Sequence, residues 1–252
     1  MKTLVTYAVE AEFAPWRALR EFEKTVGGVE LQRTKVGTST VDFVITGVGT
    51  ANAQRAMEGL AVTEYSLCIA SGFAGALQPS VKIGDVVVAK RVQQDGSGRT
   101  VECALNFWTS AMDDGAKPIE TLLTTAHLVN TAAEKSQLAS FGEAVDMESF
   151  AILSTAQASN IPAIAMRVIS DSFDGDLPAG IDTLVDEQGN VHGGRVVRYV
   201  ARHPLAIPAL MRLGRESKAA AEALARFLEA YIKKLSLATH GWPPELQEVA
   251  AS

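Results

Sequence analysis

The sequence predicts a single α/β domain. Its 252 residues are 47% hydrophobic, which is enough to bury a substantial core. Strand-like and helix-like patterns alternate from one end of the chain to the other, as they do in α/β folds. The continuous apolar run 163–169 has the length and composition of a buried parallel strand.

Strands are predicted where short runs are rich in apolar and β-branched residues. These runs lie at 3–9, 29–36, 39–45, 66–70, 86–92, 119–124 and 163–169. The second and third strands form a hairpin whose turn is Gly37-Thr38.

Helices are predicted where apolar residues recur at helical spacing. They cover about 10–24, 51–60, a segment beginning near Ala132, 147–159 and about 205–235. Thr131 caps the third helix, Asn160 and Pro162 end the fourth, and Pro208 is tolerated in the first turn of the last.

Two glycine-rich stretches follow predicted strands. Residues 46–50, TGVGT, join a strand to a helix, a geometry in which backbone N–H groups can face an anion; a simple tight turn explains them equally. Residues 71–76, SGFAGA, let the backbone approach either a ligand or a neighbouring strand.

The pattern is weak in three segments. Residues 93–118 are predicted to form a loop whose Phe107 and Trp108 either line a pocket or anchor the core. The irregular stretch 172–194 has the length of a lid, flap or interface loop. Residues 241–252 are expected to be a partly disordered tail.

Composition excludes several classes of function. A net charge of −6 and the lack of a dense basic run argue against binding to nucleic acid. No apolar stretch reaches the roughly 20 residues that span a bilayer. Two cysteines and four scattered histidines form neither a disulfide framework nor a metal site, so we expect a cytoplasmic protein without a metal or cofactor.

Carboxylates are therefore the remaining candidates for chemistry. Asp171, with Ser170, follows a buried strand at the end where open α/β sheets usually hold ligands. Asp146 and Glu148 lie at the start of the preceding helix, where Asp146 is better explained as a helix cap. Glu10 and Glu12 follow the first strand, and the pattern alone favours solvated acids in a first helical turn.

Five segments occur along the chain in the order TLVTYAVEAEF, VITGVGTANA, IASGFAGALQPSVKIGDVVVA, AVDMES and MRVISD. Together they resemble the nucleoside phosphorylase/nucleosidase superfamily. Within it they are most similar to methylthioadenosine/S-adenosylhomocysteine nucleosidases. The VDMES segment and the tail RVVRYVARHPLAIPALMRL resemble hopanoid-associated phosphorylases. The resemblance implies a nucleoside phosphorylase-like fold over residues 1–240, with a central mixed sheet flanked by helices.

The resemblance also implies roles for individual residues. Asp171, oriented by Ser170, matches the acid that hydrogen-bonds the purine and helps to protonate its N7. Glu148 matches the acid that binds the ribose hydroxyls, and Glu12 matches the acid that activates the attacking water. We expect Asp171 to be protonated, or to share a proton with the base, through burial. Further substrate-binding candidates on these grounds are Met147, Gly72, Phe73, Leu128, Val145 and Phe173.

Ala70 and Phe73 stand where phosphate-using relatives carry an arginine and a serine, which favours hydrolysis over phosphorolysis. Arg20 and Arg55 remain alternative phosphate ligands. Arg167, inside the apolar strand, is interpreted as a buried charge held by a carboxylate.

The resulting hypothesis is a purine nucleosidase that releases adenine from an adenosine derivative with an apolar 5′-substituent, resembling adenosylhopane or methylthioadenosine. The alternatives are a phosphorylase, a futalosine-type hydrolase and a non-catalytic nucleoside-binding protein. The expected partners are a small-molecule purine nucleoside and, by resemblance, a second copy of the chain in a homodimer.

Overall fold

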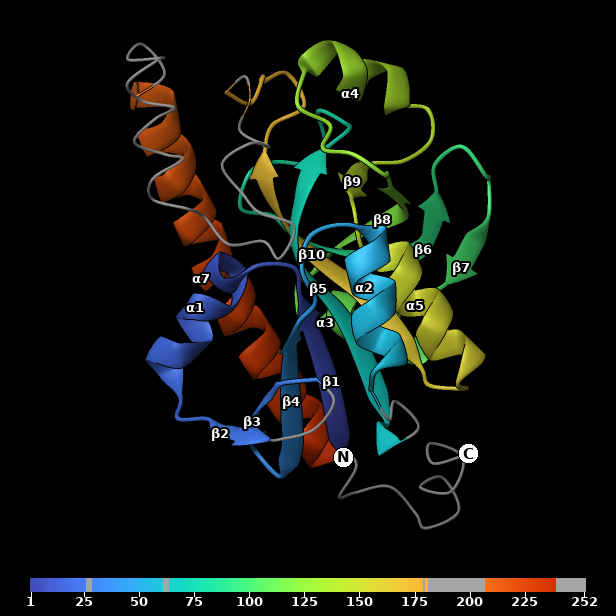
Figure 1. Ribbon diagram of the computed structural model, residues 1–252, viewed down its shortest axis with the longest axis vertical. Coiled ribbons are helices and arrows are strands. Elements are labelled where there is room, and N and C mark those ends of the chain that lie inside the picture. Colours follow the sequence, from blue (N-terminus) through green and yellow to red (C-terminus); the bar gives the residue numbers. More distant parts are fainter. Residues whose placement is uncertain (26–28, 61–63, 179, 181–206, 239–252) are drawn as a thin grey trace.

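One mixed β-sheet runs through the molecule and is covered by helices on two sides (Figure 1). The computed structural model describes residues 1–25, 29–60, 64–178, 180 and 207–238. Its strands are β1 (Lys2–Tyr7), β2 (Glu23–Thr25), β3 (Leu31–Val36), β4 (Ser39–Ile45), β5 (Leu67–Ala76), β6 (Val86–Gln94), β7 (Thr100–Glu102), β8 (Lys117–Thr124), β9 (Ala144–Asp146) and β10 (Ala163–Asp171). Its helices are α1 (Glu10–Leu19), α2 (Thr50–Glu58), α3 (Leu105–Asp113), α4 (Ala132–Leu138), α5 (Ser149–Ala158) and α7 (Ile207–Ala238). The predicted α/β class is confirmed.

Strand β5 is the centre of the sheet. It pairs in parallel with β1 on one side and with β10 on the other, and its last residues pair antiparallel with β9. Because β10 also pairs with β6, β6 with β8 and β8 with β9, these five strands close into a ring. The predicted hairpin is confirmed, since Val36 and Ser39 pair across Gly37-Thr38.

The prediction that β5 ends at residue 70 is wrong, because the glycine-rich stretch 71–76 continues the strand. Glycine and alanine have low strand propensity, so the sequence pattern hid this extension. Its register with β10 runs from Cys68, opposite Ala163, to Gly75, opposite Asp171. The register shifts between Ile169 and Asp171, which leaves Ser170 at an irregularity beside the end of β10.

The predicted loop 93–118 is also wrong, because it contains β7 and α3. Phe107 and Trp108 lie on α3 and pack against the main core, and the Trp108 indole N–H donates to the Val88 carbonyl at 3.3 Å. Of the two interpretations of these aromatic residues, core anchoring is the one observed. The first helix ends at Leu19 rather than near Lys24, and β2 follows it.

Helices α1 and α7 lie on one side of the sheet, and α2 and α5 lie on the other (Figure 1). The predicted long amphipathic helix is confirmed as α7, with Pro208 as its second residue. The predicted loop 172–194 is described only to residue 178 and at 180. The predicted tail 241–252 lies outside the described residues.

Within the part of the chain that the structure describes, no helix is long and apolar enough to cross a membrane. Cys68 and Cys103 are both buried and unpaired, and burial raises the pKa of each thiol to about 12. Neither sulfur is therefore a reactive thiolate near neutral pH.

Candidate active site

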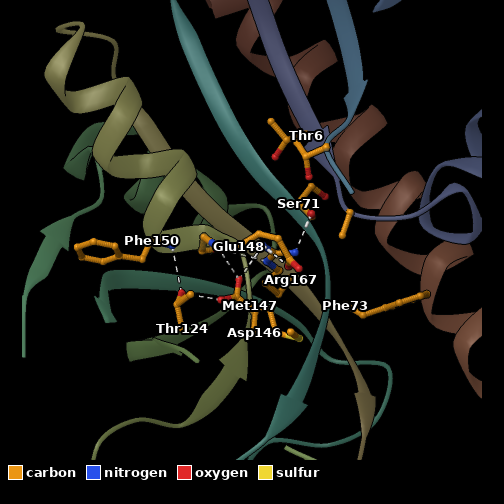
Figure 2. Close-up of polar contacts among 12 residues, drawn as sticks. Thr6, Ser71, Phe73, Thr124, Asp146, Met147, Glu148, Phe150 and Arg167 are labelled. Carbon is orange, nitrogen blue, oxygen red and sulfur yellow. Dashed lines mark hydrogen bonds and ion pairs between the residues drawn. The ribbon is translucent and has the colours of Figure 1, made fainter. Parts of the chain in front are cut away.

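Arg167, in the middle of β10, is the hub of the candidate site (Figure 2). Its side chain is 1% exposed, and one of its Nη atoms lies 2.6 Å from Asp146 Oδ2 and 3.7 Å from Glu148 Oε2. The guanidinium also donates to the Ser71 carbonyl at 2.8 Å and to the Ser149 hydroxyl at 2.9 Å. The prediction that Arg167 is a buried charge held by a carboxylate is confirmed.

Asp146 is the carboxylate that pairs most closely with Arg167, and its side chain is fully buried. It accepts hydrogen bonds from the Thr124 hydroxyl at 2.6 Å and from the Ser149 N–H at 3.2 Å, at the start of α5. The helix-start role expected for Asp146 is thereby confirmed. With no exposed oxygen and its partners in place, Asp146 is a structural acid.

Glu148 immediately precedes α5 and faces the glycine-rich turn before α2. The Gly49 N–H donates to its Oε1 at 2.8 Å, so the anion that this turn faces is the protein's own carboxylate. Burial raises the pKa of Glu148 to about 7, against the opposing effect of the Arg167 cation. Its side chain is 7% exposed, in contrast to that of Asp146.

Glu12 is buried, although the residue pattern favoured a solvated acid. Its carboxylate accepts hydrogen bonds from the N–H groups of Ala8 at 2.7 Å and Val9 at 3.1 Å. It also accepts one from the N–H of Phe73, in β5, at 2.7 Å. Burial raises the pKa of Glu12, and the Arg167 cation opposes this shift. Glu12 lies four residues before the buried Trp16, so helical spacing already put it on the inward face of α1. By contrast, Glu10 is partly exposed and pairs with Arg17.

Gly72 lets β5 approach these charged groups. Its φ is +133°, and a Cβ atom placed on it would lie 2.5 Å from Glu12 Oε1 and 2.7 Å from Arg167 Nη1. Both contacts are shorter than a side-chain carbon tolerates, so this position requires glycine.

Asp171, at the end of β10, has a different set of partners. Its Oδ1 accepts the Ser170 hydroxyl at 2.9 Å, and its Oδ2 lies 2.5 Å from the Lys135 ammonium. The Asp171 side chain is 13% exposed. The sequence predicted burial of this acid but not the ion pair with Lys135 that accompanies it. Lys135 was not predicted from the sequence. It lies three residues before the partly buried Leu138 on α4, and this spacing could have indicated that both residues lie on the inward face of the helix.

The acids thus fall into two groups along the paired strands β5 and β10. Glu12 and Glu148 surround Arg167, opposite Gly72, whereas Asp171 lies opposite Gly75. The partner positions Gly72 and Gly75 are three residues apart on β5, which is roughly 10 Å of strand. The candidate site therefore contains a group of buried acids around Arg167 and, separately, one acid that is ion-paired with Lys135.

The other candidate residues lie around these two groups. The Met147 carbonyl accepts the Thr50 hydroxyl at 3.0 Å. Phe73 and Phe173 are partly buried against the main core, and in Figure 2 the Phe73 ring points away from Arg167. Val145 is buried in a small apolar cluster with Leu77, Leu123 and Val129. Leu128 is 36% exposed.

Two further observations concern possible metal ligands and a groove elsewhere on the surface. In the described residues, no group of three or more His, Cys, Asp or Glu side chains is arranged to hold a metal ion. A surface groove of about 540 Å³ is lined by residues such as Arg91, Glu120 and Phe141, and it includes none of the candidate residues.

The comparisons with known proteins agree with this architecture. The sequence profile of the Phosphorylase superfamily matches residues 2–202. A comparison with the sequences of curated proteins found no significant match.

Several solved structures share the fold. The Helicobacter pylori 5′-methylthioadenosine/S-adenosyl homocysteine nucleosidase has a TM-score of 0.71 and 18% identity, covering 93% of this chain and 98% of that chain. The Neisseria meningitidis 5′-methylthioadenosine/S-adenosylhomocysteine nucleosidase has a TM-score of 0.70 and 19% identity, covering 92% and 99%. The futalosine hydrolase of Helicobacter pylori has a TM-score of 0.71 and 18% identity, covering 93% and 98%.

Proposed function

The chain belongs to the Phosphorylase superfamily, and from that premise we propose that it is a purine nucleosidase. It would hydrolyse the N-glycosidic bond of an adenosine derivative with an apolar 5′-substituent and release adenine. The observation that carries this proposal is the pair of buried acids Glu12 and Glu148, both with raised pKa values, which face Arg167 on β10, the strand that ends in Asp171.

Carboxylates suit this reaction because it passes through an oxocarbenium-like state, with positive charge on the sugar and negative charge on the base. The C1′–N9 bond breaks, its electron pair stays with the base, and the base takes a proton at N7 from the Asp171 carboxyl group. Water forms the new bond to C1′, and Glu12 takes the proton that the water loses. A general base works best when its pKa lies near the working pH, and burial moves the pKa of Glu12 in that direction.

Glu148 would bind the ribose hydroxyls in its ionised form. Because its pKa is about 7, the fraction of carboxylate that can accept hydroxyl protons grows as the pH rises through neutrality. Asp171 would bind the base. A carboxylate accepts the hydrogen bond of a 6-amino group, which favours adenine over a 6-oxo purine.

Water is favoured over phosphate as the nucleophile because the nearby guanidinium is already engaged. Arg167 contacts Asp146, Ser71 and Ser149. Arg20 bonds the Lys35 carbonyl and Glu229, and Arg55 bonds Asn52, so each has a protein partner. A phosphate dianion needs several N–H donors or guanidinium groups to replace its water.

An apolar 5′-substituent is supported by two aromatic residues that lie close to the acid-bearing positions along the chain. Phe73 is adjacent in sequence to Gly72 and donates its N–H to Glu12, and Phe173 follows Asp171 by two residues. The resemblance of the VDMES segment to hopanoid-associated phosphorylases supports a large group such as that of adenosylhopane.

The test is to supply adenosine, methylthioadenosine, a long-chain 5′-alkyl adenosine and futalosine, with and without phosphate, and to measure the released base by coupled xanthine oxidase absorbance. We expect adenine and the free sugar without any need for phosphate. Dependence on phosphate, with ribose 1-phosphate as product, would make the protein a phosphorylase. Binding without release of base would make it a nucleoside-binding protein, and cleavage of futalosine alone would make it a futalosine-type hydrolase.

A further inference from the structure

We propose that Lys135 is a positioning residue that holds the Asp171 carboxylate toward the purine base. The inference rests on the proposed function. It concerns a residue of α4 that lies outside the acid and guanidinium cluster around Arg167.

The surroundings of Lys135 are unusual for a lysine. Its side chain is fully buried, and its ammonium donates to Asp171 Oδ2 at 2.5 Å, to the Ser172 carbonyl at 2.6 Å and to the Gly175 carbonyl at 3.1 Å. An ammonium has three protons, so every donor is used. The only anionic partner among the three is the proposed base-binding acid.

A purely structural role, as a clamp between α4 and the segment after β10, explains less. That segment is already fastened to the start of α4 by two other bonds. The Ala132 N–H donates to Asp176 at 2.7 Å, and the Leu177 N–H donates to the Asn130 carbonyl at 2.8 Å. Burying an ammonium is costly, and an apolar side chain of similar length would fill the space without that cost.

The geometry of Asp171 shows what the lysine adds. Ser170 bonds one carboxylate oxygen and Lys135 bonds the other, which fixes the rotation of the group. Each oxygen has a second lone pair, so one acceptor position per oxygen is left for a ligand. The two positions suit the 6-amino group and a proton shared with N7 of adenine. Gly75 lies next to this carboxylate, since a Cβ atom placed on Gly75 would be 2.9 Å from Asp171 Oδ2.

A double-mutant cycle tests the proposal, with adenine release as the readout and Lys135→Met, Asp171→Asn and the double variant as the proteins. We expect Lys135→Met to lower kcat by about 10- to 100-fold, a loss of the size seen when a residue that orients a metal ligand is replaced, with a smaller change in KM. In the Asp171→Asn background, the same change should have little further effect, because Lys135 acts through Asp171.

The control is Lys90→Met, which removes an exposed lysine that pairs with Glu120, and it should keep the wild-type kcat. Thermal melts establish that each variant folds. If Lys135→Met does not fold, Lys135→Arg, which keeps the cation, replaces it in the cycle; its kcat should fall in the wild-type background and be unchanged in the Asp171→Asn background.

A wild-type kcat in the folded Lys135 variant, or an equal loss in both backgrounds, would overturn the inference and leave the proposed function standing. A wild-type protein that neither releases adenine nor binds it by calorimetry would remove the proposed function and this inference together.

Discussion

Charge balance around Arg167 explains the chemistry expected of individual side chains. One guanidinium faces Asp146, Glu148 and Glu12, so the cluster cannot be neutral if all three acids are ionised. Asp146 has the closest contact, at 2.6 Å, and Glu148 is farther away, at 3.7 Å. Burial therefore raises the pKa of Glu148 to about 7 and also raises that of Glu12, despite the cation.

The raised pKa of Glu148 predicts a pH dependence of stability. In the unfolded chain this carboxyl titrates near its ordinary value of 4.5, so between that pH and about 7 the folded state binds more protons than the unfolded state. The free energy of unfolding therefore falls as the pH rises through this window. We expect Glu148→Gln to remove this contribution, which amounts to roughly 1–3 kcal/mol.

The measurement is urea unfolding from pH 5 to 8, comparing the wild type with Glu148→Gln. Glu10→Gln is the control, since it removes a partly exposed acid that pairs with Arg17. Identical pH slopes for the wild type and Glu148→Gln would contradict the raised pKa.

Gly72 leads to a second prediction at this scale. Gly72→Ala should destabilise the fold and abolish turnover, because its Cβ would meet Glu12 and Arg167 in the buried cluster. Overpacking costs roughly 1–3 kcal/mol, and the backbone strain costs a similar amount.

Gly115→Ala separates these two causes. Gly115 has a φ of +99° with nothing within 4 Å of its Cβ position, so that variant has backbone strain without the clash. Chemical denaturation should show a clearly larger loss for Gly72→Ala, and equal losses would count against the steric argument.

Among the elements, the short helix α4 links Asp171, the proposed base-binding acid, to the surface. It has seven residues, too few to be stable alone, so its ends need support. Thr131 provides it, since its hydroxyl accepts the Glu134 N–H at 3.2 Å. The same helix holds Lys135, so its position affects Asp171.

Thr131→Ala should lower the free energy of unfolding by about 1 kcal/mol, the usual value of an N-cap. Thr131→Ser keeps the hydroxyl and should be close to the wild type. Thermal melts and kcat for adenine release are measured on both variants. If α4 positions Asp171, kcat falls in the alanine variant alone; unchanged stability in that variant would refute the cap's contribution.

For the whole molecule, we predict a homodimer. The expectation comes from the family resemblance, and large apolar side chains remain exposed on the single chain, including Leu105, Leu128 and Phe141. A second chain that covers such residues would bury apolar surface, which stabilises association. Sedimentation equilibrium should give twice 26.8 kDa, and a mass of 26.8 kDa at all concentrations would rule the dimer out.

The sequence pattern gave the fold class, the hairpin, the cap of α4 and the long last helix, because each depends on neighbours along the chain. It failed at residues 71–76 and at 105–113. In the first stretch, glycine is selected by the closeness of Glu12 and Arg167 rather than by strand propensity. In the second, α3 is held by packing against β6 and the core.

The sequence by itself determined the superfamily, which the profile match confirms, and it pointed to Glu12, Glu148 and Asp171 through short motifs. Only the tertiary structure decided which acids share a guanidinium and which one is paired with a lysine. Those residues come from α1, α4, β9, β10 and the position before α5, and the pKa of a buried carboxyl depends on every charge around it in space. Residues 36 positions apart, such as Lys135 and Asp171, become neighbours only when the sheet closes.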